Sequence, residues 1–271
     1  MLVAVLSDIH GNPIALDAVL EDVRASGGAD MFLVLGDLAA IGYDPIGVLE
    51  RISALPNVRC VQGNTDRYVV KGQRPYPSVE DARSDPGLIP RLVEISHSFA
   101  WTQGVVYAGG WFDWLAALPL EERFDLPDGS RLLGVHVAPG QVDGPGIHPR
   151  LSDAELVSHV QNAGADLVCV GHTHWPVDRT VAGVRVINSG SVSNPIAFDL
   201  RASYARIEAT SNSVHVEHRR IAYDVDSVID AVERSHHPAG AYIISHMRGE
   251  RRPWWSDSAG PEIPGIHQQP R

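Results

Sequence analysis

Residues 1–13 read MLVAVLSDIHGNP, and this stretch decides the fold of the first third of the chain. The apolar run Leu2–Leu6 is typical of a strand that is buried on both faces of a sheet. Asn12 and Pro13 predict the start of a helix, because Asn is a good N-cap and Pro suits the first helical position. The residues between them, 7–11, therefore lie at the carboxyl end of a buried strand.

The same alternation of strand and helix is then repeated twice. Gly27-Gly28 ends the first helix, and Met31–Leu35 is a second buried strand. Asp44-Pro45 repeats the signal of an N-cap followed by proline and starts a second helix. Val58–Val61 is a third strand. This βαβαβ order predicts a parallel sheet with right-handed crossovers.

The rest of the chain is divided as follows. Residues 1–235 are predicted to form one domain, with an insertion of loop and helix at about 67–118, and residues 236–271 form a C-terminal extension whose order the sequence does not decide. Expected elements are helices at Leu88–Ser96, Gly110–Leu118, Ser152–Ala163 and Asp226–Arg234, a hairpin of Glu121–Leu126 with Ser130–Val135, strands at Leu167–Val170 and Val184–Ile187, and a closing pair at Tyr204–Glu208 and Val214–Arg219.

Composition narrows the classes of partner. The 271 residues carry a formal net charge of −11 and no long basic stretch, which argues against a nucleic-acid duplex or an anionic membrane as partner. No apolar run approaches the ~20 residues that span a bilayer. Cys60 and Cys169 sit in apolar runs and are predicted to be buried thiols rather than a disulfide. We therefore expect a cytoplasmic protein, and its oligomeric state is not readable. An anionic substrate would need bound cations to attract it.

Polar side chains follow five separate strands of the expected fold. These residues are Asp8 and His10 after the first strand, Asp37 after the second, Asn64 after the third, His136 after Leu133–Val135, and His172 and His174 after Leu167–Val170. Ligand sites in open α/β sheets form outside the carboxyl ends of the strands. Taken singly, each residue also fits an ordinary role as a turn former, a helix cap or a solvated His. Their joint occurrence predicts one site at one sheet edge.

These segments resemble the five signature blocks of the calcineurin-like metallophosphoesterases. The blocks are Asp8-Ile9-His10-Gly11-Asn12, Gly36-Asp37, Gly63-Asn64-Thr65-Asp66, His136 and Gly171-His172-Thr173-His174. Within that superfamily the chain is most similar to the YfcE-like bacterial and archaeal phosphodiesterases, which Asn188-Ser-Gly-Ser-Val192 also resembles. The likeness covers about residues 1–223. It implies an α/β fold of four layers, αββα, in which two β-sheets are flanked by helices.

The resemblance also implies how the ligands are shared between two divalent metal ions. One ion takes Asp8, His10 and His174, the other takes Asn64, His136 and His172, and Asp37 bridges both. Carboxylate, imidazole and amide ligands together suit transition metals better than Ca or Mg. Mn²⁺ is our first expectation, with Fe, Zn, Ni and Mg as alternatives. Such a pair of ions can clamp a phosphate and hold the hydroxide that attacks phosphorus in line.

Residues that touch the substrate are harder to assign. Asn12 and Arg67 are candidates for binding the phosphate, although Arg67 fits a surface salt bridge equally well. Thr65 stands where many superfamily members have a His that donates a proton, and a hydroxyl cannot replace it near pH 7. Besides Asn64, the candidate for a catalytic role is His148, which could instead be an ordinary loop His.

The expected activity is hydrolysis of small phosphodiesters or nucleotides. One alternative is a phosphomonoesterase, including a protein phosphatase, since both activities use the same ligands. Another is a binding scaffold of low activity, as in the retromer subunit that shares this fold. Loss of activity usually removes ligands, and all seven positions here can bind a metal, which favours an enzyme.

Overall fold

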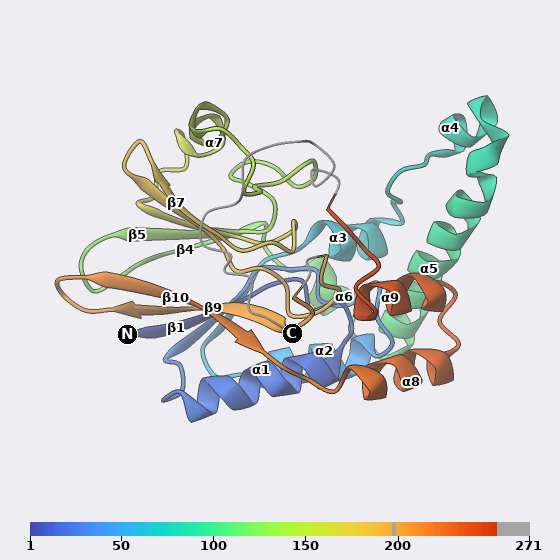
Figure 1. The fold of residues 1–271 in the computed structure, drawn as a ribbon, viewed down its shortest axis with the longest axis horizontal. Coiled ribbons are helices and arrows are strands. Elements are labelled where there is room, and N and C mark those ends of the chain that lie inside the picture. The colour runs from blue at the N-terminus through green and yellow to red at the C-terminus, as the bar shows by residue number, and fades with distance from the viewer. Residues whose placement is uncertain (197–198, 254–271) are drawn as a thin grey trace.

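The computed structural model describes residues 1–196 and 199–253, which form a sandwich of two five-stranded sheets (Figure 1). The first sheet has the order β10-β9-β1-β2-β3 and the second β4-β5-β6-β8-β7. The strands of the first are β1 (Leu2–Leu6), β2 (Met31–Val34), β3 (Val58–Cys60), β9 (Ala202–Ala209) and β10 (Val214–Ile221). Those of the second are β4 (Glu121–Asp125), β5 (Arg131–Val135), β6 (Leu167–Val170), β7 (Val177–Val181) and β8 (Val184–Asn188).

Helices flank both sheets, so the predicted sandwich is confirmed. α1 (Pro13–Ala25) and α2 (Pro45–Ser53) lie below the first sheet in Figure 1, and α7 (Asp153–Val160) lies above the second. The predicted parallel pairing is also confirmed, because β1 pairs with β2 and β2 with β3 in parallel. Asn12 caps α1 by accepting from the Ala15 N–H at 3.1 Å, as predicted for Asn followed by Pro.

Alternate residues of β1 enter two different cores. Val3 and Val5 point between the two sheets, where they pack with residues such as Leu33, Leu132 and Ile187. Ala4 and Leu6 point the other way, into the core between the first sheet and the helices α1 and α2. Fully burying one such aliphatic side chain stabilises the fold by ~1.5–3 kcal/mol. The strand is thus buried on both faces, and the polar residues that follow it begin at its carboxyl end.

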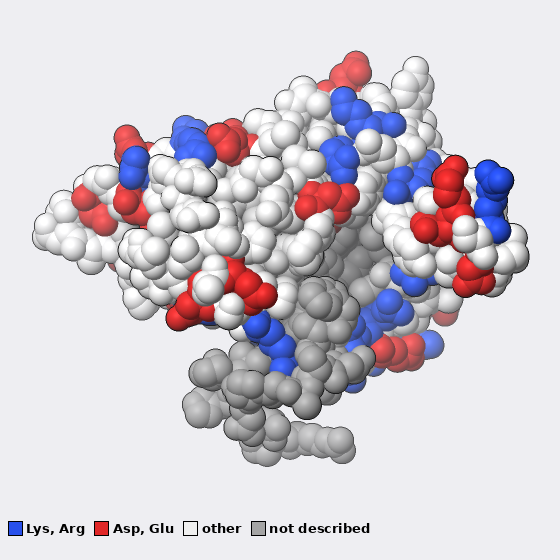
Figure 2. Space-filling model, turned by 90° about the horizontal axis from the view of Figure 1, so that it is seen from above, with Lys and Arg blue, Asp and Glu red and all other residues white. Residues whose placement is uncertain are grey.

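Both cysteines are free and buried, as predicted. Burial raises the pKa of the Cys60 and Cys169 thiols to about 12, so neither is a reactive thiolate. No helix in the described part of the chain is long and apolar enough to cross a membrane. On the face seen in Figure 2, groups of Lys and Arg are interspersed with groups of Asp and Glu, in keeping with the absence of a long basic stretch in the sequence.

The stretch predicted as an insertion is more helical than expected. It holds α3 (Asn64–Lys71), α4 (Val79–Ser84), a 3₁₀ turn (Pro86–Leu88), α5 (Ile89–Ala108) and α6 (Phe112–Ala116). α5 is about twice as long as predicted, since nothing ends it before Gly109-Gly110. Its outer end projects from the body together with α4 (Figure 1).

The first part of the C-terminal extension, residues 236–253, contains helix α9 (Gly240–Met247), which packs on the last helix of the predicted domain, α8 (Val225–Ser235). The contact is made through Val228, Val232, Ile243 and Met247. Ile41 and other side chains of the body pack against this cluster, so α9 is held on the sandwich. The remainder of the predicted extension, 254–271, lies outside the described residues.

Candidate functional site

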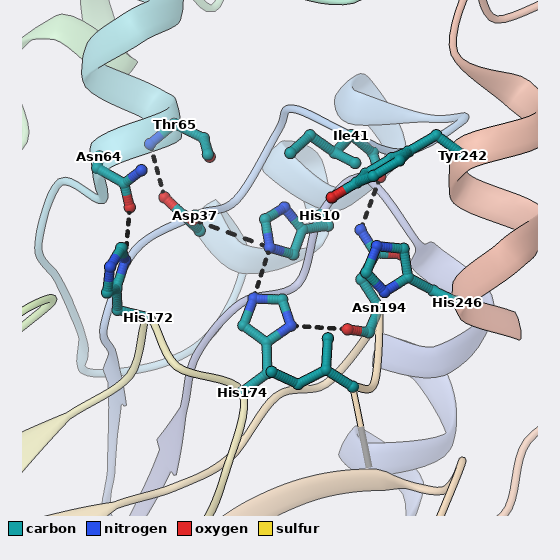
Figure 3. A pocket seen from close by; sticks show the side chains of 11 residues that line it. His10, Asp37, Ile41, Asn64, Thr65, His172, His174, Asn194, Tyr242 and His246 are labelled. Atoms are coloured by element: carbon teal, nitrogen blue, oxygen red, sulfur yellow. Dashed lines mark hydrogen bonds and ion pairs between the residues drawn. The ribbon is translucent and has the colours of Figure 1, made fainter. Parts of the chain in front are cut away.

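The loops after β1, β2 and β3 of the first sheet and after β5 and β6 of the second meet at one end of the sandwich. The predicted single sheet edge is therefore wrong: two stacked sheets contribute to the cluster. Backbone hydrogen bonds hold the first two loops together: the N–H of His10 donates to the Asp37 carbonyl at 2.9 Å. Figure 3 shows side chains from several of these loops facing one another. The seven side chains predicted as metal ligands are thereby brought into one cluster.

Most of these residues have a strained backbone. The φ angle is positive at Asp8 (56°), His10 (48°), Asp37 (56°), His172 (68°) and His174 (55°). Residues with a Cβ rarely adopt this left-handed region, and each instance costs of order 1 kcal/mol or more. The tight turns that result aim successive side chains into one space, which a regular strand or helix could not do.

The first group of side chains is Asp8, His10 and His174. The Nδ1–H of His10 donates to the Ala40 carbonyl at 2.9 Å, and that of His174 donates to the Asn194 carbonyl at 2.7 Å. This donation leaves a lone pair on each Nε2, and the two Nε2 atoms lie 3.2 Å apart. Asp8 Oδ1 lies 3.3 Å from His174 Nε2, is buried, and has no hydrogen-bond partner among the described residues.

The second group is Asn64, His136 and His172. Asn64 Oδ1 lies 2.9 Å from both His136 Nε2 and His172 Nδ1. The other ring nitrogen of His136 donates to the Leu35 carbonyl at 2.6 Å, and that of His172 donates to the Gly144 carbonyl at 2.8 Å. Again the backbone fixes each tautomer, so that the atoms facing inward are acceptors.

Asp37 lies between the two groups. Its Oδ2 is 3.8 Å from His10 Nε2, and its Oδ1 is 3.4 Å from His136 Nε2. Oδ1 also accepts a hydrogen bond from the Thr65 N–H at 2.9 Å, which fixes the orientation of the carboxylate. One oxygen therefore faces each group, as a bridging ligand requires.

Inward-facing acceptors without donors repel one another unless positive charge lies among them. Burial alone would lower the pKa of His136, but the charge and hydrogen bond of Asp37 raise it to about 10. The pKa of His174 is likewise raised, against the effect of burial, by Asp8. The cluster thus demands cationic charge, and divalent metal ions supply it with suitable ligands. Within the described residues, the ligand atoms of Asp8, His10 and His174 lie within 4.8 Å of one another, as do those of Asp8, Asp37 and His136.

Two glycines of the motifs are needed because backbone and side chains approach closely. A Cβ atom on Gly171 would lie 1.8 Å from Ser7 Oγ and 2.7 Å from Asp8 Oδ2. A Cβ atom on Gly63 would lie 2.1 Å from Asp37 Oδ1. Larger residues at these positions would displace the carboxylates, so the glycines belong to the architecture of the site.

Asp66 holds the loops of Asp37 and Asn64 together, a role that the sequence analysis left unassigned. Its Oδ2 accepts from the N–H groups of Asp37 (2.8 Å) and Gly63 (3.0 Å), and its Oδ1 accepts from that of Leu38 (3.0 Å). Burial, together with the charge of Asp37, raises the pKa of Asp66 to about 6. Its contacts are all with donors, so the ionised form fits this position.

Replacing Asp66 with Asn should weaken metal binding roughly 10–100-fold, because the amide NH₂ would face a backbone N–H where the carboxylate accepts one. Metal titration monitored by calorimetry measures the effect. Asp81→Asn is the matched control, since Asp81 also accepts from a backbone N–H, that of Ser78, but lies in α4, within the insertion. Unchanged metal affinity in a folded Asp66→Asn protein would contradict the positioning role.

The side chains of the other three predicted residues make contacts of their own near the cluster. The Asn12 side chain caps α1 and donates to Ser193 Oγ at 2.9 Å, so its hydrogen-bonding groups are engaged. Arg67 forms a salt bridge with Asp143 at 2.8 Å, the surface role that the sequence left open. His148 is buried in the loop before α7 rather than exposed, and burial lowers its pKa. None of the three lines the pocket at the cluster.

That pocket has a volume of about 210 Å³ and is bounded by residues that the sequence analysis missed. These are Ile41, Asn194, Ile196, Tyr242 and His246, which join His10, Asp37, Asn64, Thr65, His172 and His174 in the lining. Tyr242 and His246 belong to α9, more than 60 residues beyond the last predicted ligand. A short helix with one Tyr and one His carries no signal in the sequence that would assign it to the site.

Comparison with known proteins agrees with this geometry. The family model of the calcineurin-like phosphoesterase superfamily domain matches residues 1–212. An uncharacterized protein of Methanocaldococcus jannaschii, MJ0912, is 29% identical over 257 residues, which cover 88% of this chain and 94% of that protein. The crystal structure of hypothetical protein PH1004 from Pyrococcus horikoshii has a TM-score of 0.75 at 21% identity, covering 91% of this chain and 97% of that chain.

A metallophosphoesterase from Sphaerobacter thermophilus has the same fold. Its crystal structure gives a TM-score of 0.68 at 24% identity and covers 92% of this chain and 99% of its own. The family match spans most of the chain and includes all seven clustered side chains. The chain therefore belongs to the calcineurin-like phosphoesterase superfamily.

Proposed function

We propose that this protein is a phosphodiesterase that uses two divalent metal ions to hydrolyse small phosphodiesters or nucleotides. The observation that carries the proposal is the arrangement around Asp37. Two groups of inward-facing acceptor atoms lie on either side of its carboxylate, and one oxygen faces each group. Buried acceptors so arranged fit a pair of cations better than any network of protein hydrogen bonds.

The ligand chemistry supports transition metals. Asp8, His10 and His174 would hold one ion, and Asn64, His136 and His172 the other, with Asp37 shared. Four imidazoles among seven ligands favour Mn, Fe or Zn over Ca, and we propose Mn²⁺ for both positions. When bound, the ions supply positive charge for the phosphate oxygens and lower the pKa of a water molecule.

Other residues of the chain hold the candidate ligands in fixed orientations. Backbone carbonyls hold the rings of His10 and His174 in one tautomer, while Thr65 N–H and Asp66 fix the carboxylate and the loop of Asp37. Such preorganisation spares the reaction the cost of orienting groups as charge develops. Thr65 lines the pocket, but its hydroxyl cannot protonate a leaving group near pH 7. We therefore expect a preference for esters whose leaving group is already a good one.

Metal content and turnover together test the proposal. Protein treated with a chelator and then reconstituted with Mn²⁺ should bind two ions per chain and regain hydrolysis. The reconstituted protein should hydrolyse bis-p-nitrophenyl phosphate faster than p-nitrophenyl phosphate. Preference for the monoester would instead indicate a phosphomonoesterase. Two bound ions with no turnover of either ester would indicate a binding scaffold, and failure to bind metal would overturn the site itself.

A further inference from the structure

Helix α9 forms one wall of the pocket, opposite the metal-binding cluster. Tyr242 and His246 lie one turn apart on this helix, and both line the pocket. Between them on the helix, Ile243 is buried in the cluster that joins α8 and α9 to the body. The wall is therefore docked by apolar packing and presents its two polar aromatic side chains to the site.

The ring of Tyr242 is held from two sides. The His246 ring packs against it edge-on, with centroids 5.0 Å apart and planes at 78°. The Arg251 guanidinium lies 4.7 Å from its centroid, a cation–π contact. Figure 3 shows its hydroxyl end pointing from α9 toward His10. Within residues 1–196 and 199–253 this hydroxyl makes no hydrogen bond, and it lies at the pocket, where a bound molecule can accept one.

Apolar side chains also line this pocket. Ile41 and Ile196 belong to its lining together with the candidate metal ligands, Asn194 and His246, and Figure 3 shows Ile41 next to Tyr242. Ile41 has φ 64°, which is rare for a β-branched residue. The Asn194 side chain donates to the Ile41 carbonyl at 2.9 Å and so holds this backbone conformation at the pocket. The lining thus combines ligand atoms suited to a phosphate with apolar side chains that can contact an organic group.

We propose that Tyr242 determines specificity: its hydroxyl donates a hydrogen bond to the phosphoryl group of the substrate, and its ring, with Ile41 and Ile196, binds a compact aromatic or apolar ester group. This inference rests on the proposed function of the metal-binding cluster. A volume of about 210 Å³ lies below the ~300 Å³ at which sites for larger ligands begin, so it admits one ring beside the phosphate. Arg251 adds a positive charge beside this wall in a chain of net charge −11, which favours an anion.

Binding of phosphonates to the Mn²⁺-loaded protein tests the proposal without turnover, because a P–C bond is not hydrolysed. By calorimetry, wild type should bind phenylphosphonate roughly tenfold or more tightly than methylphosphonate, since the ring is removed from water. Tyr242→Phe should weaken both by roughly tenfold, because a hydrogen bond to a charged group is lost. Tyr242→Leu should in addition remove most of the preference for the phenyl compound.

Tyr107→Phe and Tyr107→Leu are matched controls, because Tyr107 is 73% exposed on α5 and does not line the pocket. Equal affinities in wild type and Tyr242→Phe would overturn the hydrogen bond, and a phenyl preference that survives in Tyr242→Leu would overturn the apolar wall. If Tyr242→Leu does not fold, the preference is measured in Ile196→Ala instead. Wild type that contains metal but binds neither phosphonate would overturn the proposed function as well as the role of Tyr242. Metal content is therefore measured on each sample, so that weak binding caused by loss of metal is distinguished from weak binding caused by the change at Tyr242.

Discussion

Asp37→Asn should abolish most of the activity and release at least one metal ion. The amide keeps the volume of the carboxylate but removes the negative charge that faces both groups of ligands. Its nitrogen would also direct N–H bonds into a space lined by acceptors. We expect kcat/KM for bis-p-nitrophenyl phosphate to fall by at least ~10³-fold, the scale seen when one preorganised electrostatic contact is lost. Elemental analysis of the purified variant measures the loss of metal.

Asp17→Asn is the control for charge alone. Asp17 is an exposed aspartate that pairs with Arg51 on the outer helices. Near-normal turnover with full metal content in Asp37→Asn would show that the bridging position is wrongly assigned. Asp17→Asn itself should keep its turnover and its metal content, because a surface ion pair is worth ~1 kcal/mol or less.

His172→Ala and His174→Ala should each remove a different ion, although the two residues lie two positions apart. His172 Nδ1 faces Asn64, whereas His174 Nε2 faces His10 and Asp8. The left-handed backbone at both residues turns their side chains to opposite sides of Asp37. We expect anomalous-scattering maps of Mn²⁺-soaked crystals to lose one peak in each variant, and turnover to fall by ~10²-fold or more in both.

His159→Ala serves as the control, because His159 is a partly exposed residue of α7 whose ring bonds Gln141. Loss of the same anomalous peak in both His172→Ala and His174→Ala would contradict the division of ligands. Retention of both peaks in either variant would contradict it equally.

The fold was predictable where local signals and burial agree. Leu2–Leu6 is apolar throughout, and Asn12-Pro13 sets the start of α1, so the first parallel strands followed from short stretches of sequence. β7 (Val177–Val181) was missed, because its middle residues are polar and only its two ends are buried. α5 was predicted too short, because its apolar residues follow no clear helical period and only Gly109-Gly110 ends it.

The candidate ligands were predictable for a related reason. Asp8 and Asp37 follow β1 and β2, which are parallel neighbours, so these two had to meet at one edge. His136 follows β5 of the second sheet, so its approach to them depends on how the two sheets stack, which no local pattern gives. The role of Arg67 was ambiguous, because the direction of its side chain is set by a salt bridge to Asp143, which lies 76 residues further along the chain. Tyr242 could not be assigned, because it reaches the pocket only through the tertiary packing of α9, and that packing leaves no local pattern.

The position of α9 in the chain gives the site an order of assembly during synthesis. All seven candidate ligands have been translated by His174, whereas α9 ends at Met247. At a typical 5–20 residues per second, the ribosome needs roughly 4–15 s to cover that interval. β9, which pairs with β1, and Asn194, whose carbonyl holds the His174 ring, are made within that interval, and α9 follows both. On the proposal for Tyr242, changes in α9 alter substrate preference without altering the seven candidate ligands.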